Sequence, residues 1–399
     1  MTRTGGNVML EEDFIREHRT RRVEEVALLL AGRKELDAGR VLRRIEGWQR
    51  LRQKVPSWAA CEDLDYPRRL ALEQCSGEAA ARYKATVAGR LLPAGGTMAD
   101  LTGGLGVDFS FVARRFGRAV YVERQPELCA AARHNFPLLG LPEAVVTEAD
   151  GTDFLRRMKP VDLLFMDPAR RDGAGRKTVR IGDCDPDVAE LLPLLLEKGR
   201  YVMLKLSPML DLHEALTQLG CVEEAHVTGA SGECKELLLV LRKGAESPVL
   251  CCADCDVAEA EFRFRPEEEE AARPVWAEKV RAFLYEPSPV LLKAGAFKLA
   301  AVRFGLEKLH PNSHLYTSDR EVRGFPGRCF RVERTAGFGK RELRDFMAGT
   351  ERANLTVRNF PASVADLRKR LRLKEGGDEY WFATTLRDGT RRLIACRKI

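Results

Sequence analysis

Apolar and polar residues alternate along the middle of the chain with two different periods. Between residues 97 and 243, short apolar runs predict strands, and stretches with apolar residues three or four apart predict helices between them. The predicted strands lie near 97–101, 118–123, 144–148, 161–166, 199–206, 221–228 and 235–242. The predicted helices lie near 106–116, 126–138, 151–158, 186–197 and 210–219. This alternation is typical of a parallel, doubly wound α/β sheet, with the last two strands as a hairpin that places an antiparallel strand at the sheet edge.

The flanking regions follow other patterns. Residues 9–55 have helical spacing, and residues 73–90 predict a helix with Ser76 as its N-cap. Residues 244–280, which include the acidic run RPEEEEAARP, predict a solvated linker. The C-terminal part predicts, in order, a helix at 288–304, a strand at 329–334, a helix at 340–348, a strand at 353–358, a helix at 363–372 and a hairpin that turns at Asp388-Gly389. We therefore expect an N-terminal helical region at 1–95, a Rossmann-like domain at 96–245, a linker with a small unit at 246–325 and an α+β domain at 326–399.

Composition narrows the class of protein. No run of about 18 apolar residues exists, and the start lacks the pattern of a signal peptide, so we expect a cytoplasmic protein without a membrane partner. The 11 cysteines are scattered, which predicts reduced thiols. Only Cys252 and Cys255 form a CxxC pair, so no metal site is predicted. Residues 300–399 hold 22 basic and 12 acidic side chains, and this net charge of +10 indicates either a polyanion partner or a solubilising surface.

A glycine-rich loop, DLTGGLGVD at 100–108, follows the first predicted strand and opens a helix. Glycines let a backbone approach a ligand closely, and a helix N-terminus offers amide donors. The loop lacks the third glycine of the GxGxxG pattern that binds pyrophosphate, which disfavours a nicotinamide-dependent enzyme. Glycine loops are also common as structural turns, so the acidic residues downstream matter more.

Acidic residues follow the next three predicted strands in order. Glu123 ends the second strand, where a carboxylate can accept hydrogen bonds from ribose hydroxyls, and Asp150 follows the third, where an adenine amine could meet it. Asp167 and Pro168 end the fourth strand, beside the same crevice. Each alone could be a solvated acid or a strand end, but together they indicate a nucleoside-binding site.

These motifs resemble those of class I S-adenosylmethionine-dependent methyltransferases. More closely, nearly the whole chain resembles a bacterial methyltransferase family with a C-terminal THUMP-like domain, through YPRRLALEQCSGEAAARYKA, DLTGGLGVDFSF, DPARRD, LKLSPMLDL, ECKELLL, YEPSPVLLKAGAFK and LHPNSHLYTSD. The resemblance implies a Rossmann-like seven-stranded sheet at 96–245, a ferredoxin-like unit within 246–325 and a THUMP-like domain at 326–399. Because THUMP domains are associated with RNA, it also implies modification of tRNA or rRNA. No feature predicts an obligate protein partner.

The resemblance assigns roles to individual positions. Residues that match the cofactor-binding motifs are Asp100, Thr102, Gly104, Gly106, Glu123 and Asp150, with Thr102 where many methyltransferases have glycine. Gln74 and Ser76 match a segment that closes over the methionine end of the cofactor, although Ser76 could equally be a helix cap. Asp167 and Pro168 match the first half of the DPPY-type motif of amino-methyltransferases, but Ala169 and Arg170 follow in place of Pro and the aromatic residue.

The expected reaction is methylation of an exocyclic or ring nitrogen of an RNA base, with Asp167 and the Pro168 carbonyl accepting hydrogen bonds from the target amine. Basic residues could hold phosphates beside the pocket, namely Arg170, Arg171, Arg176, Lys177, Arg180 and Lys205. Lys205 could instead pair with an acid. In the tail, RNA could contact Arg368, Lys369, Arg370, Arg372, Tyr380, Trp381 and Phe382, although some of these aromatic residues could be core.

Other interpretations stay open. The chain could methylate a protein or a small molecule, or it could bind RNA through a vestigial methyltransferase fold without catalysis. Methylation at pyrimidine C5 would need a cysteine nucleophile. Cys184 and Cys234 are conceivable, but neither lies in a Pro-Cys motif.

Overall fold

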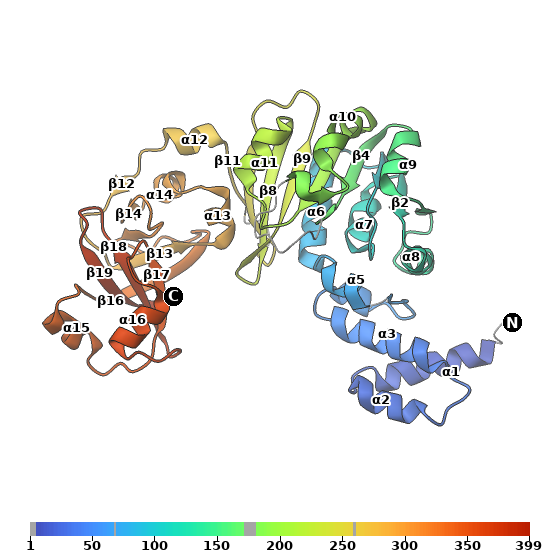
Figure 1. Cartoon of the computed structure of the whole chain (residues 1–399), viewed down its shortest axis with the longest axis horizontal. Helices are drawn as coiled ribbons and strands as arrows, with labels where there is room; N and C mark the ends of the chain where they lie inside the picture. The colour runs from blue at the N-terminus through green and yellow to red at the C-terminus, as the bar shows by residue number, and fades with distance from the viewer. Residues whose placement is uncertain (1–4, 68, 171–180, 258–260) are drawn as a thin grey trace. The chain divides into compact units, whose positions relative to one another are not determined.

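The computed structural model describes residues 5–67, 69–170, 181–257 and 261–399. The chain divides into two compact units, one formed by 1–224 with 236–246 and the other by 225–235 with 247–399 (Figure 1). No helix in the described ranges is long and apolar enough to cross a membrane.

The first unit contains the predicted alternation of strands and helices. Its strands are β1 (Thr97–Asp100), β2 (Arg118–Glu123), β3 (Val145–Glu148), β4 (Val161–Met166), β7 (Gly199–Leu206) and most of β9 (Glu233–Leu241). The strand β8 (Val222–Ala230) belongs to the same sheet, but most of its residues fall in the second unit. Its helices after β1 are α7 (Val107–Val112), α8 (Pro126–Leu138), α9 (Gly151–Arg157), α10 (Val188–Lys198) and α11 (Leu212–Leu219). Short elements lie between them, namely η1 (Ala113–Arg115), β5 (Ala169–Arg170), η2 (Ile181–Asp183) and β6 (Cys184–Asp185). The predicted α/β class is confirmed.

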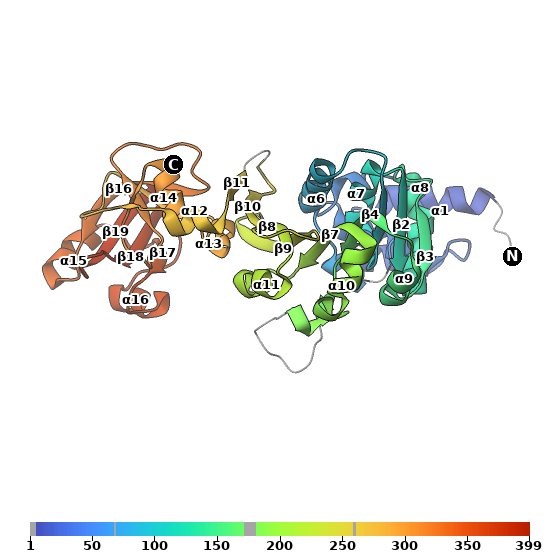
Figure 2. The same ribbon diagram turned by 90° about the horizontal axis from the view of Figure 1, so that it is seen from above.

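The strand order explains where a ligand can bind. The sheet runs β11-β10-β8-β9-β7-β4-β1-β2-β3; β1 pairs in parallel with both β2 and β4, and β9 is antiparallel to β7. Helices α7 and α8 lie on one side of the sheet, and α9, α10 and α11 lie on the other (Figure 2). The order reverses at β1, between β2 and β4, and doubly wound sheets bind ligands at the carboxyl ends of the strands at such a point.

Two expectations about this sheet were wrong. The β8–β9 hairpin does not form the edge, because β10 (Val249–Asp254) and β11 (Glu261–Phe264) extend the sheet from seven strands to nine. Both strands come from the segment predicted as a solvated linker. Phe262 and Phe264 are buried, and β11 pairs with β10. The short apolar runs of this segment therefore form strands of the sheet. The neighbouring acidic run made the segment resemble a linker.

The acidic run itself forms helix α12 (Pro266–Ala271). Pro266 occupies its first turn together with Glu267, Glu268 and Glu269. Proline is favourable there because the N–H that it lacks would have no partner within the helix, and acidic residues are favourable because the helix dipole is positive at that end. The Glu269 carboxylate also accepts hydrogen bonds from the amides of Lys298 and Leu299, so the acidic run has structural contacts.

The N-terminal region is helical, as predicted. It contains α1 (Gly5–His18), α2 (Val23–Leu30), α3 (Ala38–Leu51), α4 (Pro56–Ala59), α5 (Arg69–Gln74) and α6 (Glu78–Leu91). The predicted helix at 73–90 is two helices, and the N-cap of α6 is Gly77. The hydroxyl of Ser76 donates to Asp108, so its expected role as a helix cap was wrong.

The second unit is built on an eight-stranded sheet with the order β12-β14-β15-β13-β16-β19-β18-β17. Its strands are β12 (Val275–Trp276), β13 (Phe283–Pro287), β14 (Glu307–Lys308), β15 (Tyr316–Ser318), β16 (Gly327–Ala336), β17 (Asn354–Arg358), β18 (Glu379–Thr385) and β19 (Arg391–Lys398). Its remaining helices are α13 (Pro289–Ala294), α14 (Lys298–Phe304), α15 (Lys340–Met347) and α16 (Val364–Leu371). The helix expected at 288–304 breaks at Gly295, whose φ of 81° is left-handed.

Two aromatic residues that we expected to contact RNA belong to the core of this unit. Trp381 and Phe382 are both fully buried on β18. Trp381 packs in a cluster with Phe346 of α15 and Leu367 of α16, and Phe382 packs on the opposite face of the sheet. Because successive strand residues point to opposite faces, and both faces are covered here, neither ring is available to stack on a base.

Candidate methyl-transfer site

The glycine loop leads from the end of β1 into α7 and contacts the end of β2. The carboxylate of Asp100 accepts a hydrogen bond from the Thr102 amide (2.9 Å), and Glu123 accepts one from the Gly104 amide (2.9 Å). Gly104 and Gly106 have φ values of 55° and 84°, and Gly106 is the N-cap of α7. The left-handed backbone at these two positions favours glycine, which explains the sequence of the loop.

Close packing also requires a glycine at position 103. A Cβ atom on Gly103 would lie 2.2 Å from the ring of Tyr121, which is fully buried on β2. The loop therefore packs closely against the sheet at the point where β1 and β2 end.

Asp150 lies at the end of β3 and caps α9. Its Oδ1 accepts hydrogen bonds from the amides of Thr152 (2.9 Å) and Asp153 (3.1 Å), and the residue is exposed. A Cβ atom on the next residue, Gly151, would lie 2.1 Å from the carbonyl oxygen of Leu101, so this turn rests against the end of β1. Asp150 therefore has a structural role as a cap, with its side chain still open to solvent at this edge.

Asp167 and Pro168 follow β4 directly. The Asp167 amide donates a 2.6 Å hydrogen bond to the hydroxyl of Thr102, and the Asp167 Oδ2 accepts one from the Lys205 Nζ, also at 2.6 Å. The Asp167 side chain is 39% exposed, and Pro168 is buried. The threonine that departs from the usual glycine thus links the loop to the Asp-Pro motif.

Behind this motif lies a chain of charged side chains that the sequence did not indicate. Asp108, at the start of α7, accepts a hydrogen bond from the Ser76 hydroxyl (2.7 Å) and pairs with Lys84 (3.2 Å) and Lys205 (3.6 Å). Lys84 is fully buried on α6 and also pairs with Glu236 of β9. Asp108 was visible as the last residue of the loop motif. Lys84 and Glu236 lie within two stretches that carry the family resemblance, YPRRLALEQCSGEAAARYKA and ECKELLL, but nothing local marks them as partners.

The charges of this group influence one another. Burial raises the pKa of Asp100 to about 8, and the nearby carboxylates of Asp108, Asp167 and Glu123 push it in the same direction. Burial opposes the charges of Asp108 and Lys205, but their mutual attraction and the partners Lys84 and Asp167 outweigh it. The pKa of Asp108 is therefore lowered and that of Lys205 raised. Around Asp100 the acidic side chains outnumber the lysines, and this environment suits a cationic ligand.

The remaining predicted positions are Gln74, the basic residues after Pro168, and Lys205. Gln74 is exposed at the end of α5. Of Arg170 the structure describes only the backbone, within β5, and Arg171, Arg176, Lys177 and Arg180 lie outside the described residues. Lys205 pairs with carboxylates, one of the two alternatives left open for it.

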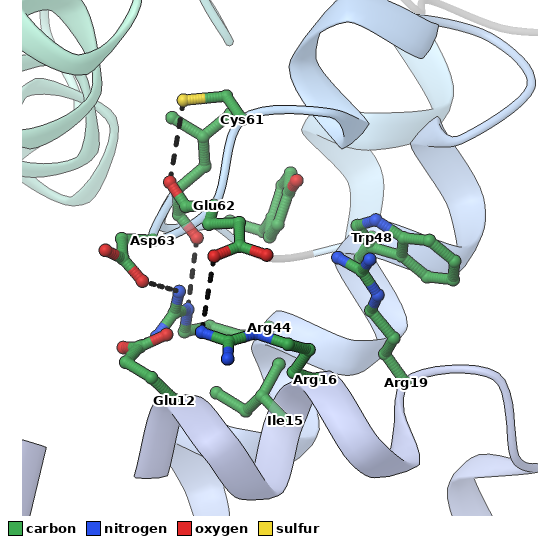
Figure 3. A pocket seen from close by; sticks show the side chains of 11 residues that line it. Glu12, Ile15, Arg16, Arg19, Arg44, Trp48, Cys61, Glu62 and Asp63 are labelled. Atoms are coloured by element: carbon green, nitrogen blue, oxygen red, sulfur yellow. Dashed lines mark hydrogen bonds and ion pairs between the residues drawn. The ribbon is translucent and has the colours of Figure 1, made fainter. Parts of the chain in front are cut away.

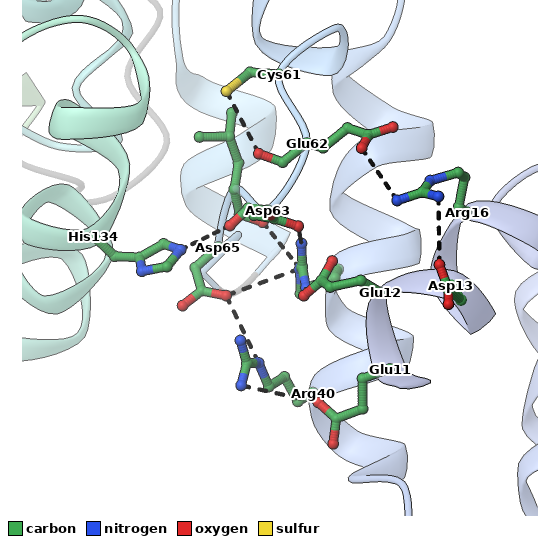
Figure 4. A network of polar contacts seen from close by, with 12 residues as sticks. Glu11, Glu12, Asp13, Arg16, Arg40, Cys61, Glu62, Asp63, Asp65 and His134 are labelled. Atoms are coloured by element: carbon green, nitrogen blue, oxygen red, sulfur yellow. Dashed lines mark hydrogen bonds and ion pairs between the residues drawn. The ribbon is translucent and has the colours of Figure 1, made fainter. Parts of the chain in front are cut away.

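A separate pocket lies in the N-terminal helical region, lined by Arg44, Trp48 and Cys61 among others (Figure 3). Arg44 is 5% exposed in its side chain and pairs with Glu12 and Asp63 (Figure 3). His134 of α8 contacts the carbonyl oxygen of Asp63 at 2.7 Å (Figure 4). These contacts hold α1, α3 and the segment after α4 together and against the sheet domain, and the pocket contains none of the predicted site residues.

Comparison with known proteins relates this fold and site to a family. Residues 283–326 match a family of ferredoxin-like domains, and residues 327–398 match a family described as THUMP domain-like. Over its whole length the chain is similar to a crystal structure from Porphyromonas gingivalis W83 that is described as a methyltransferase. The two are 34% identical with a TM-score of 0.85, and the match covers 100% of both chains. The chain belongs to this methyltransferase family.

Two further relatives identify the cofactor of the methyltransferase. They come from two strains of Mycobacterium tuberculosis, and each is called an uncharacterized S-adenosylmethionine-dependent methyltransferase. Each is 28% identical over 307 residues, covering 76% of this chain and 80% of the relative. The chain is thus an S-adenosylmethionine-dependent methyltransferase. Its site fits that cofactor, because S-adenosylmethionine carries a sulfonium cation and the carboxylates of Asp108, Glu123 and Asp167 lie near the carboxyl group of Asp100 beside the glycine loop.

Proposed function

We propose that this methyltransferase transfers the methyl group to an exocyclic or ring nitrogen of a base in tRNA or rRNA. The observation that carries the proposal is the Asp167-Pro168 pair at the carboxyl end of β4, held against the glycine loop by the bond to Thr102. A carboxylate and a carbonyl at that position are hydrogen-bond acceptors, which is what an amine acceptor requires for its alignment.

Six residues would hold the cofactor: Asp100, Thr102, Gly104, Gly106, Glu123 and Asp150. Glu123 would accept hydrogen bonds from the ribose hydroxyls, because each of its oxygens has a second lone pair beyond its bonds to Gly104 and Gln125. Asp150 would meet the adenine amine. Gln74 and Ser76 would lie toward the methionine end, with Ser76 acting through its bond to Asp108.

When bound, S-adenosylmethionine supplies an already electrophilic methyl carbon, so the protein contributes mainly position. Asp167 would accept a hydrogen bond from the target amine and turn the nitrogen lone pair toward that carbon. The Pro168 carbonyl would accept a second. A base within a duplex would have to leave its stack to reach these groups.

An RNA substrate is supported by the second unit. Its match to THUMP-like domains is joined by a net charge of +10 over residues 300–399. Arg331 of β16 and Arg397 of β19 lie directly opposite each other in the sheet register, and both are exposed. The Arg331 guanidinium lies 5.8 Å from the ring of Phe283. Arg397 also faces Glu379 on its other neighbouring strand, β18, which compensates part of its charge. The remaining positive charge at this exposed pair would attract a phosphate.

The test compares modified nucleosides, by mass spectrometry, in tRNA and rRNA from cells with and without the gene. We expect one methylated nucleoside to disappear, to return with the wild-type gene and to stay absent with Asp167→Ala. If no methylated nucleoside changes, the RNA proposal fails. Transfer of labelled methyl groups to proteins or small molecules in the same extracts would then identify the acceptor class.

A further inference from the structure

Lys205 lies between two carboxylates at the end of β7. Its Nζ is 2.6 Å from the Asp167 Oδ2 and 3.6 Å from the Asp108 Oδ2, and its side chain is 13% exposed. A charge-assisted hydrogen bond at 2.6 Å with this burial is short and restricts both side chains. Such a lysine has little freedom to reach a phosphate outside the pocket.

Asp108 is held from its other side by groups of the N-terminal helical region. The Ser76 hydroxyl donates to its Oδ2 and Lys84 pairs with its Oδ1, so three groups fix this carboxylate. Lys84 is in turn fixed by Glu236. The charged groups that face Lys205 are thus Asp167 after β4, Asp108 on α7 and Glu236 on β9, with the Cys75 thiol also within its electrostatic influence.

We propose that Lys205 is a positioning residue that orients Asp167 for the acceptor nitrogen and is itself aligned by Asp108. This inference rests on the proposed role of Asp167. The Lys205 ammonium occupies Oδ2, and the Thr102 hydroxyl fixes the backbone of the same residue, so the carboxylate is held at two points. Its Oδ1 is then the oxygen that faces the target amine.

The arrangement also defines what Asp167 does during transfer. The nitrogen lone pair forms the bond to the methyl carbon, the carbon–sulfur bond breaks, and its electron pair stays on sulfur. The methylated nitrogen then loses a proton. With Lys205 holding its charge, Asp167 acts as a hydrogen-bond acceptor, and the proton passes to water.

The experiment uses the full chain, tritiated S-adenosylmethionine and bulk RNA from cells that lack the gene. The variants are Lys205→Met, Lys205→Arg, Asp167→Asn and the double variant Lys205→Met with Asp167→Asn. Lys235→Met, which alters an exposed lysine on β9, is the matched control. Titration calorimetry measures S-adenosylmethionine affinity for each.

We expect Lys205→Met to lower kcat about 100-fold, the effect of misplacing a catalytic group, while the KM for RNA and the cofactor affinity change less than about threefold. Lys205→Arg should restore at least a tenth of the activity, since it keeps the cation. The double variant should be no slower than Asp167→Asn alone, because Lys205 acts only through Asp167. Additive losses, or no rescue by arginine, would overturn the proposal.

A second measurement separates this inference from the RNA proposal. The ¹⁵N NMR signal of the Lys205 ammonium should be protected from exchange in the wild-type protein and should shift in Asp167→Asn. This readout needs no acceptor substrate. If bulk RNA accepts no methyl group but the signal shifts, the RNA proposal fails and the ion pair stands; an unshifted signal would refute the positioning role even if RNA is methylated.

Discussion

The Asp167 amide donates a 2.6 Å hydrogen bond to the hydroxyl of Thr102, and this bond joins the glycine loop to the Asp-Pro motif across 65 residues of sequence. Thr102 stands where many relatives of the fold have glycine. Its side chain therefore performs a function that glycine could not, because glycine has no hydroxyl. The strands β1 and β4 are neighbours in the sheet, which brings the two residues together.

This bond predicts the outcome of two substitutions at residue 102. Thr102→Ala removes the acceptor of the Asp167 amide, so we expect kcat to fall about tenfold, and cofactor affinity should also fall because Thr102 is among the residues proposed to hold the cofactor. Thr102→Ser keeps a hydroxyl and should retain most of the activity. Steady-state methyl transfer to RNA and calorimetry measure the two quantities. Equal activity of the alanine and serine variants would show that the bond has no catalytic role.

Glu123 provides a test of the cofactor site. Glu123→Ala removes a carboxylate that bonds to the Gly104 amide, so we expect S-adenosylmethionine affinity to fall at least tenfold, since a charged hydrogen bond contributes about 1.5–3 kcal/mol. Glu148→Ala, at an exposed position on the neighbouring strand β3, is the matched control. Unchanged affinity in Glu123→Ala, measured by calorimetry, would exclude the proposed ribose contact.

Asp100 predicts how stability and binding vary with pH. Its native-state pKa is raised to about 8 from an ordinary value of 3.8, so the folded protein holds a proton that the unfolded chain releases. This stabilisation is fully present below about pH 4 and is lost as pH rises through 8. Asp100→Asn should therefore gain stability over the wild type as pH rises, by a few kcal/mol at most, as thermal unfolding without cofactor would show.

The same group links cofactor binding to pH in the opposite sense. A sulfonium cation favours the ionised form of Asp100, so affinity for S-adenosylmethionine should rise between pH 6 and 8 and then level off. S-adenosylhomocysteine, which lacks that charge, is the matched control and should show a weaker dependence. Identical pH profiles for the two ligands in calorimetry would rule out this linkage.

Replacing Lys84 should have a large effect on the stability of the folded protein. Lys84→Met leaves the buried carboxylates of Glu236 and Asp108 without this cation, which should destabilise the protein by about 3–5 kcal/mol. Adding Glu236→Gln should recover part of the loss. Urea unfolding measures the difference, with the exposed Lys159→Met as control. A loss no larger than that of the control would mean that the pairs contribute little.

The arginines of the second unit predict a salt-dependent effect on RNA binding. Arg331→Glu with Arg397→Glu should weaken binding to unmodified tRNA and rRNA about tenfold at moderate salt and reduce the salt dependence of the affinity. Arg22→Glu, an equally exposed charge change in the N-terminal region, should have little effect. Filter binding across a salt series tests this. Equal affinities for the two variants would place the RNA contact elsewhere.

The sequence by itself determined the elements and their chemistry wherever the signal is local. The alternation of strands and helices, the glycine loop and the acids at the ends of β2, β3 and β4 all lie within short segments, so periodicity and motif spacing reveal them. The Rossmann-like seven-stranded sheet follows from the family resemblance. The nine-strand extension does not, because a run of glutamates beside two short apolar strands is also typical of a linker.

Only the tertiary structure decided which charges meet. Lys84 and Glu236 are 152 residues apart, and Lys205 and Asp167 are 38 apart. No periodic pattern marks any of these four as partners, because their contact depends on how α6, β4, β7 and β9 pack. The burial of Trp381 and Phe382 has the same origin, since covering both faces of a strand depends on elements distant in the chain. Local sequence patterns predict helices and strands. Which buried charges pair depends on how those helices and strands pack together.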